Sequence, residues 1–298
     1  MKATANVSSG AVNYQNDHIL YVEGDEHSID TEVLKTLLGN ILWIQPLGSS
    51  LSISSVAESL YPTHPNSYFL IDRDYHLSDE CIEAYWQNFP DPQTHNLLVW
   101  RRKELENDFL EPSFLVGSSY CKEEFKENNG QRLQAKVISL AQERLYLDAA
   151  NYVIVSLRED FKRKWVENFS NPSEFPNEES ALDRLTEMSE FKAFSARVSQ
   201  LTAEQEIARR FRQFLNQMTG GTESLQWGSG AWLNMISGKS IFRSLVAHCF
   251  WVFALDGTRL QSKEAINCVA KDLVRAGKKL PDDLLELKSL IETRVGIQ

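Results

Sequence analysis

Two apolar stretches that end in acids constrain most strongly how this chain can fold. Residues 68–71 are followed by Asp72 and Asp74, and residues 19–22 are followed by Glu23. In both stretches the apolar residues are continuous, which is typical of strands buried on both faces of a parallel sheet. Ligand sites in such sheets lie at the carboxyl ends of the strands. We therefore expect the two strands to lie side by side and to bring their acids to one edge.

The first hundred residues alternate between strand-like and helix-like segments, joined by short links. Such an alternation favours a parallel sheet with helices on both faces. The predicted fold class is therefore α/β, with a mostly parallel sheet flanked by helices. In chain order, the predicted strands and helices are strand 19–22, helix 29–38, strand 41–47, helix 53–60, strand 68–71, helix 80–86 and strand 97–100.

The remainder of the chain has the spacing of helices. Residues 131–169 contain neither glycine nor proline, and apolar residues recur there at intervals of three and four. We therefore predict an α/β domain over residues 1–118 and an all-helical domain over residues 119–298. Further helices are expected at residues 180–190, 203–218, 232–255, 262–276 and 282–295.

The composition limits the class of protein. The net charge is −10 and the pI is near 5.2, so contact with nucleic acid requires a local basic patch or metal ions that offset the carboxylates. The four cysteines lack C-x-x-C spacing, which argues against a zinc site or a disulfide framework. The longest apolar run, residues 245–255, is too short to span a bilayer, and residues 1–16 lack the apolar core of a signal peptide. These features predict a soluble, cytoplasmic protein with no membrane contact.

The acids after the two strands predict a metal site. Alternate residues of a strand share a face, so Asp72 and Asp74 point the same way if the strand continues, and Glu23 lies beside them. Several carboxylates without a matching lysine repel one another, and a hard cation such as Mg²⁺ or Mn²⁺ relieves that repulsion. Such a metal can activate water and stabilise a phosphodiester undergoing cleavage. The alternative interpretation is a polar strand end followed by an ordinary turn.

The pairing of a strand followed by Glu23-Gly24 with a strand followed by Asp72-Arg73-Asp74, about fifty residues later, resembles the toprim fold. Topoisomerases, primases and OLD-type nucleases share this fold, and the resemblance covers residues 19–110. It implies that Glu23 is a general acid or base or a metal ligand, and that Asp72 and Asp74 are metal ligands. Glu26 then becomes a further acid of the catalytic site.

One position departs from the toprim pattern. Many toprim sequences carry an acid four residues after the first glutamate, where this chain has His27. Asp25, Glu26 and Asp30 are the nearby acids that could complete the site instead, and the sequence leaves the choice among them open.

A narrower resemblance rests on two later segments. Glu106-Asn107 opens an apolar turn just after the fourth predicted strand, and residues 236–242 are similar to the helical C-terminal region of toprim effector nucleases of bacterial anti-phage defence, as in PARIS systems. The resemblance implies that Glu106 joins the acidic cluster and that the enzyme cleaves host transfer RNA.

The same resemblance implies partners. An ABC-type ATPase would hold the effector inactive until a phage protein triggers its release, and the released effector would act as a homodimer. The helical domain would then supply the dimer and partner contacts. The alternatives are a DNA nuclease or nickase of the OLD type and a non-catalytic sensor module bound to the ATPase.

Three consecutive cations lie near the predicted acids. Arg101, Arg102 and Lys103 follow the fourth predicted strand, and we expect them to contact the backbone of nucleic acid. Basic and aromatic residues also mix at 161–165 and 209–212, but a solvated helix face explains those segments equally well.

Gly238-Lys239-Ser240 has the ending of a phosphate-binding loop. That motif also requires an earlier glycine, where this chain has Leu233, and a preceding strand. Both are missing, so we exclude ATP binding at this segment.

Overall fold

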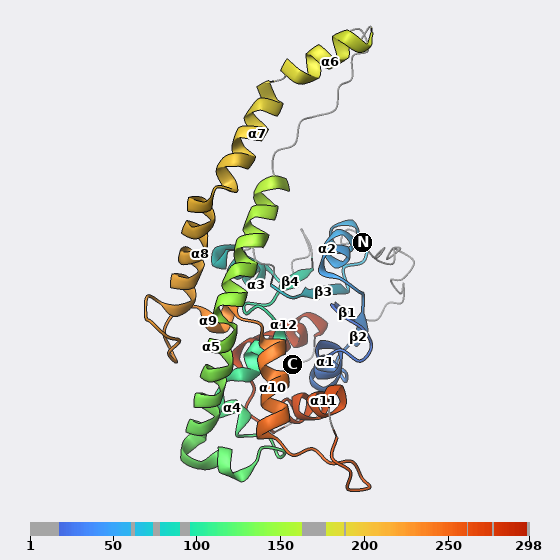
Figure 1. The fold of residues 1–298 in the computed structure, drawn as a ribbon. Coiled ribbons are helices and arrows are strands. Elements are labelled where there is room, and N and C mark those ends of the chain that lie inside the picture. Colours follow the sequence, from blue (N-terminus) through green and yellow to red (C-terminus); the bar gives the residue numbers. More distant parts are fainter. Residues whose placement is uncertain are drawn as a thin grey trace.

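The computed structural model of the 298-residue chain describes residues 18–60, 63–73, 78–89, 96–162, 177–187, 189–260, 262–275 and 277–296 (Figure 1). A parallel sheet with flanking helices is followed by a long helical region. This arrangement confirms the predicted α/β class and the helical character of the C-terminal region.

The sheet consists of four short parallel strands in the order β2-β1-β3-β4. Val22 lies opposite Leu70, and Ile71 lies opposite Val99, so β1 and β3 end at nearly the same level. Every residue of β1, β3 and β4 is buried, which accounts for their continuous apolar character. The strands are β1 (Ile19–Val22), β2 (Trp43–Pro46), β3 (Ser67–Ile71) and β4 (Leu97–Val99).

Three helices connect these strands. The first begins at Ser28, whose Oγ accepts a hydrogen bond from the backbone N–H of Thr31 (3.3 Å). The third is fixed on the sheet because Trp86 Nε1 donates a hydrogen bond to the carbonyl oxygen of Val99 (2.9 Å). The helices are α1 (Ile29–Leu38), α2 (Ser50–Leu60) and α3 (Asp79–Asn88).

The remaining elements are helical. The longest, α5, is interrupted at residues 127–130, where Asn128, Asn129 and Gly130 have positive φ angles. The helical run predicted from residue 131 starts directly after this break. The elements are η2 (Leu105–Leu110), α4 (Pro112–Leu115), α5 (Glu123–Lys162), α6 (Glu178–Glu187), α7 (Ser189–Leu201), α8 (Glu204–Thr219), α9 (Trp232–Met235), α10 (Gly238–Cys249), α11 (Ser262–Leu273) and α12 (Asp282–Val295).

The single helix predicted over residues 232–255 is wrong. It is divided into α9 and α10, and the chain leaves the helix at Phe250, which pairs with Cys121 as an isolated bridge. Trp251 then donates its backbone N–H to the carbonyl oxygen of Tyr120 (2.8 Å). Backbone pairing with a distant segment therefore ends a stretch that is apolar enough to continue as a helix.

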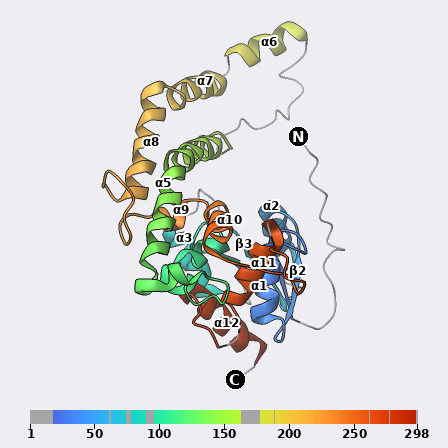
Figure 2. The same cartoon turned by 60° about the horizontal axis from the view of Figure 1, so that its bottom comes forward.

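Part of the helical region forms an arm that extends away from the sheet. α5 and α8 pack along each other, and α6 and α7 extend the arm further (Figures 1 and 2). No helix of the described part of the chain is long and apolar enough to cross a membrane.

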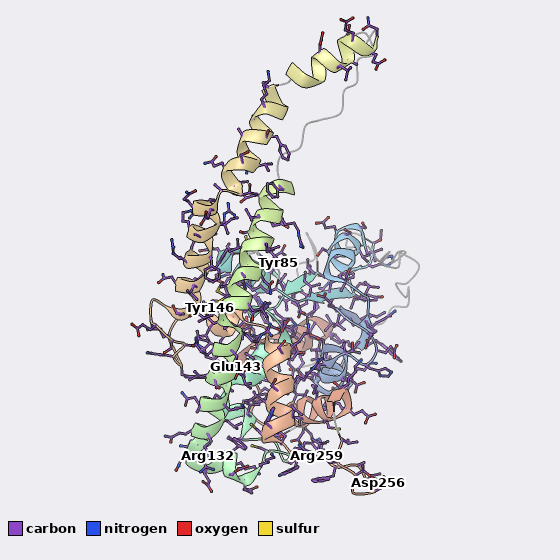
Figure 3. All side chains as sticks on the ribbon, in the orientation of Figure 1. Tyr85, Arg132, Glu143, Tyr146, Asp256 and Arg259 are labelled. Carbon is purple, nitrogen blue, oxygen red and sulfur yellow. The ribbon has the colours of Figure 1, made fainter. Side chains whose placement is uncertain are left out.

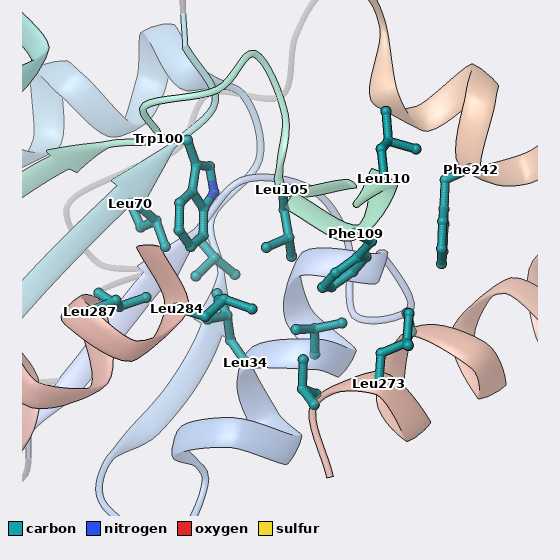
Figure 4. Packing of buried hydrophobic residues seen from close by; sticks show 14 of the residues in the cluster. Leu34, Leu70, Trp100, Leu105, Phe109, Leu110, Phe242, Leu273, Leu284 and Leu287 are labelled. Carbon is teal, nitrogen blue, oxygen red and sulfur yellow. The ribbon is translucent and has the colours of Figure 1, made fainter. Parts of the chain in front are cut away.

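One continuous hydrophobic core joins the sheet to the C-terminal helices. Figure 4 shows Leu70 and Trp100 on the side of the core where α12 contributes Leu284 and Leu287. Farther along the chain, the rings of Phe109 in η2 and Phe242 in α10 lie 5.4 Å apart. The core therefore crosses the predicted domain boundary at residue 118, and the late helices are positioned rigidly against the sheet.

Candidate functional site

The site lies where the order of the strands reverses. After β1 the chain forms β2 on one side of it and then β3 on the other. Open α/β sheets bind ligands in the crevice at the carboxyl ends of two such strands. Glu23 directly follows β1 and Asp72 directly follows β3, and the backbone N–H of Asp72 donates a hydrogen bond to Oε2 of Glu23 (3.3 Å). These two residues meet as expected, whereas Asp74 lies outside the described residues.

Two further acids reach the same place from other elements. Asp30 lies in the first turn of α1 and Glu106 lies in η2, and both side chains are buried. Burial raises the pKa of Asp30 to about 6, against the attraction of the Lys239 ammonium. Burial, with the charges of Asp30 and Asp72, raises the pKa of Glu106 well above its ordinary value. Ionisation of all the carboxyl groups of the cluster at the same time is therefore unfavourable.

Lys239, at the start of α10, is the cation of this cluster. Its Nζ lies 2.6 Å from Oδ2 of Asp72. Burial opposes the charge of the ammonium, but the carboxylates of Asp72, Glu106 and Asp30 outweigh that effect and raise the pKa of Lys239. Burial and the charge of Asp30 likewise raise the pKa of Asp72, although Lys239 counteracts them. A single lysine thus partly neutralises several converging carboxyl groups.

The Glu-Asn pair after β4 explains how Lys239 reaches the acids. Asn107 donates hydrogen bonds from Nδ2 to the carbonyl oxygens of Leu233 (2.7 Å) and Ile236 (2.8 Å), which fixes the chain just before α10. A Cβ atom on Gly238 would lie 2.6 Å from the backbone nitrogen of Asn107, so only glycine fits there. The sequence Gly238-Lys239 is therefore a close-packing device and not a phosphate-binding loop.

Glu104 completes this contact. Its Oε2 accepts a hydrogen bond from the backbone N–H of Lys239 (2.8 Å), and its carboxylate also accepts one from Ser237 Oγ (3.2 Å). A carboxylate at this end of α10 is favoured by the helix dipole and satisfies a backbone donor. The start of α10, and with it Lys239, is therefore held by η2 on two sides.

Two oxygens of the cluster are left without a partner. Asp72 Oδ1 and Glu106 Oε2 are buried and accept no hydrogen bond from any described residue. No group of three carboxylates, histidines or cysteines among the described residues is arranged to hold a metal ion, and Asp74 is not among them. The donor chemistry nevertheless fits Mg²⁺ or Mn²⁺, which prefer carboxylate oxygens and keep several waters. Glu23 and Asp72 are the residues that would hold such an ion.

An open cavity of about 680 Å³ extends from this cluster. One wall carries acids and belongs to the loops and helices that follow the strands. Another part of the lining carries cations and belongs to α10 and α11, and two of these cations, Lys239 and Lys263, pair with Asp72 and Asp25. The charged residues of the cavity are Glu23, Asp25, Asp30, Glu106, Lys239, Arg243 and Lys263.

Glu26 does not join the cluster. Its side chain is 73% exposed, and its Oε2 lies 3.9 Å from Nζ of Lys35. Asp25 lies at the mouth of the cavity, 3.3 Å from Lys263. Of the acids that could accompany Glu23, it is Asp30 that packs beside it, because Ser28 starts α1 and turns Asp30 inward.

The three consecutive cations after β4 are used inside the chain, so the structure gives no support to their predicted contact with nucleic acid. Arg101 pairs with Asp283 (2.9 Å) and Glu286 (2.7 Å) of α12. Arg102 pairs with Glu111 (2.6 Å) and Asp108 (3.1 Å). Lys103 is buried, 3.5 Å from Asp148 of α5. Acids of this chain neutralise all three, and cations of α10 and α11 line the cavity instead.

Sequence reasoning missed Lys239, Arg243 and Lys263 as site residues. The sequence does contain an indication for Lys239, because the glycine before it, Gly238, is typical of a close approach between two backbones. The spacing of four residues then places Arg243 on the same face of α10 as Lys239.

The fold and the site together define a doubly wound α/β protein with an acidic centre at the topological switch point, completed by a lysine from its helical region. Comparison with models of known protein families finds no match, and a search among curated proteins finds no significant relative.

Proposed function

We propose that this protein is a metal-dependent nuclease that cleaves phosphodiester bonds in the cavity beside β1 and β3. The observation that carries the proposal is the pair of unsatisfied, buried oxygens on Asp72 and Glu106, in a cluster of acids at the switch point. Unsatisfied buried carboxylate oxygens are costly, and a bound ion or a catalytic role accounts for their presence at a site of this kind. The cations that line the same cavity supply what a phosphate requires.

Each residue has a role in this proposal. Glu23 and Asp72 would hold Mg²⁺ or Mn²⁺, and the toprim resemblance adds Asp74 to them. The bound ion would supply an activated water and a Lewis acid for the phosphoryl oxygens. Glu106 holds or accepts a proton at Oε2, because its burial keeps the carboxyl from ionising readily. Arg243 offsets charge on the phosphate, since it lines the same cavity, while Lys239 remains paired with Asp72.

The toprim resemblance extends the proposal to a biological setting. In it the substrate is host transfer RNA, the site of action is the cytoplasm, and the outcome is anti-phage defence. An ABC-type ATPase partner holds the protein inactive until a phage protein triggers its release. The support for these points is the strand-acid motifs, Glu106-Asn107 and residues 236–242.

Support for a homodimer comes from an exposed face of α5. Leu147 and Ile154 are 55% and 57% exposed and lie two turns apart on this helix. Glu143 lies four residues before Leu147, and Arg158 lies four residues after Ile154. The charged pair and the apolar pair are therefore centred on the same point of the helix. In an antiparallel pairing of two copies, each leucine would therefore face an isoleucine and each glutamate an arginine. Two-fold interfaces are self-complementary in this way.

Metal binding can be tested without knowledge of the substrate. We expect 5 mM Mg²⁺ or Mn²⁺ to raise the melting temperature of the wild type by about 2–4 °C, as for a ligand bound only by the folded state. Asp72→Asn should remove the shift. Glu26→Gln is the matched control, because Glu26 is an exposed acid outside the cluster, and it should keep the shift.

Activity is tested on two substrates in parallel. The protein, alone and together with its ATPase partner and trigger, is incubated with total transfer RNA and with supercoiled plasmid. Cleavage of transfer RNA that Asp72→Asn abolishes supports the proposal, and nicking of plasmid alone assigns the activity to DNA instead. A wild type that shows neither a metal-dependent melting shift nor cleavage in the complete system identifies a non-catalytic module.

A further inference from the structure

A second cavity adjoins the acidic one. It has a volume of about 290 Å³, and Arg243 and Ile266 line both cavities. Apart from Arg243 and Arg259, the residues that line it are apolar, and they include Phe250 and Leu260. An apolar pocket with a few directed polar groups is the usual form of a small-ligand site.

Arg243 stands at the junction of the two cavities. It lies one turn after Lys239 on α10, and its side chain has no hydrogen-bond or ion-pair partner among the described residues. Lys239, by contrast, is committed to Asp72. Among the described cations that line the acidic cavity, Arg243 is therefore the one that is available to an incoming anion or to the polar edge of a ligand.

Arg259, on the other side of the second cavity, is held in place. Its guanidinium donates a hydrogen bond to the carbonyl oxygen of Ala247 (3.0 Å) and lies 4.4 Å from the ring centre of Trp251. Figure 3 labels Arg259 in the segment that follows α10. The pocket therefore has a cationic rim and an apolar interior.

We propose that the second cavity is a nucleobase subsite, which takes the base next to a phosphate bound in the acidic cavity. The proposal rests on the proposed nuclease function and adds where the substrate's base binds. A nucleobase has apolar faces that suit Phe250 and Leu260 and a polar edge that suits the arginines. Its phosphate falls on the side of Arg243 where Lys239 and Lys263 lie.

The lining also predicts which bases fit best. Arginine side chains only donate hydrogen bonds, so the edge that enters should present acceptors. Guanine offers O6 and N7, which arginine binds in a bidentate manner. We therefore expect guanine to bind more tightly than adenine, which places an amino group at the corresponding edge.

The test compares two small probes in EDTA, so that no cleavage takes place. Guanosine 5′-monophosphate carries a base and ribose 5-phosphate does not, and their dissociation constants are measured by calorimetric or NMR titration. We expect the nucleotide to bind the wild type about tenfold more tightly, as for one stacked base. Equal affinities for the two probes overturn the base subsite, whatever the variants show.

A pocket-filling variant locates the effect. Ala247 is an exposed residue of the pocket rim, so Ala247→Trp should block the pocket and abolish the advantage of the nucleotide while leaving ribose 5-phosphate binding unchanged. Ala84→Trp on α3, another exposed alanine that does not line the pocket, should change neither affinity. A nucleotide advantage that survives Ala247→Trp contradicts the assignment.

The two proposals fail in different ways. Metal-dependent cleavage by a wild type that binds both probes equally removes the base subsite and leaves the nuclease. Failure of the wild type to bind either probe, combined with no cleavage, removes both.

Discussion

Nζ of Lys239 lies 2.6 Å from Oδ2 of Asp72, although 167 residues separate the two along the chain. The contact joins the helical region to the end of the central strand β3, and it places a cation where several carboxyl groups converge. The packing of α10 on η2 makes this contact possible, because Gly238 lets the backbones approach and Asn107 and Glu104 hold the chain before and after it. The acidic centre is thus completed by the part of the molecule that lies outside the strands.

Removal of this cation should destabilise the protein in a pH-dependent manner. We expect Lys239→Met to lower the free energy of unfolding by about 1–3 kcal/mol at pH 7, because it leaves buried carboxylates without a partner while the lysine itself is partly exposed. The loss should shrink at pH 5, where the acids of the cluster bind protons more readily. Urea denaturation at the two pH values measures this. A loss that is equal at both would contradict the role of the lysine as a counter-charge.

Asp30 should limit stability above neutral pH. Its pKa is raised by burial to about 6 in the folded protein, from 3.8 as the ordinary value. The folded state therefore binds a proton more tightly than the unfolded state between these values, and the stability of the protein falls as the pH rises through that window. Asp30→Asn should raise the melting temperature at pH 7–8 and have little effect near pH 4.

Asp25→Asn serves as the control for Asp30. Asp25 is exposed, and its pKa is lowered by its hydrogen bond with His27 and by Lys263. Its replacement should therefore not raise the melting temperature at pH 7–8. Differential scanning calorimetry from pH 4 to pH 8 distinguishes the two variants, and parallel behaviour of both would count against the buried position of Asp30.

The close approach at Gly238 should tolerate no side chain. Gly238→Ala places a Cβ 2.6 Å from the backbone nitrogen of Asn107, so α10 must move away from η2. We expect a loss of about 3 kcal/mol or more in the free energy of unfolding, in the range of overpacked cores. Gly257→Ala is the comparison, since its φ of +83° strains the backbone but nothing lies within 4 Å of the new Cβ. Its cost should be about 1–2 kcal/mol.

The fold and the acids that follow β1 and β3 could be predicted from the sequence because both depend on local patterns. Buried parallel strands appear as continuous apolar runs, so β1, β3 and the acids that follow them are visible without coordinates. The place of Lys239 in the acidic centre cannot be predicted in this way, because its contact with Asp72 joins residues that are 167 positions apart. For the same reason, the internal ion pairs of Arg101 could not be predicted, because its partners Asp283 and Glu286 lie on α12, far along the chain. Local charge patterns do not reveal which charges a distant helix will neutralise.

The exposed face of α5 allows the proposed homodimer to be tested by exchange of charges. If two copies pair in an antiparallel manner, Glu143 of each faces Arg158 of the other across the apolar contact of Leu147 with Ile154. Glu143→Arg alone and Arg158→Glu alone each place like charges opposite one another, and each should weaken dimerisation about three- to tenfold, as expected when an exposed ion pair is replaced by a repulsive pair. The double exchange restores opposite charges and should return the affinity to that of the wild type.

Sedimentation equilibrium of the four proteins at 0.15 M salt measures this, with Leu147→Asp as a variant that should be monomeric throughout. A wild type that is monomeric at every concentration, or a double exchange weaker than both single variants, rules out this pairing.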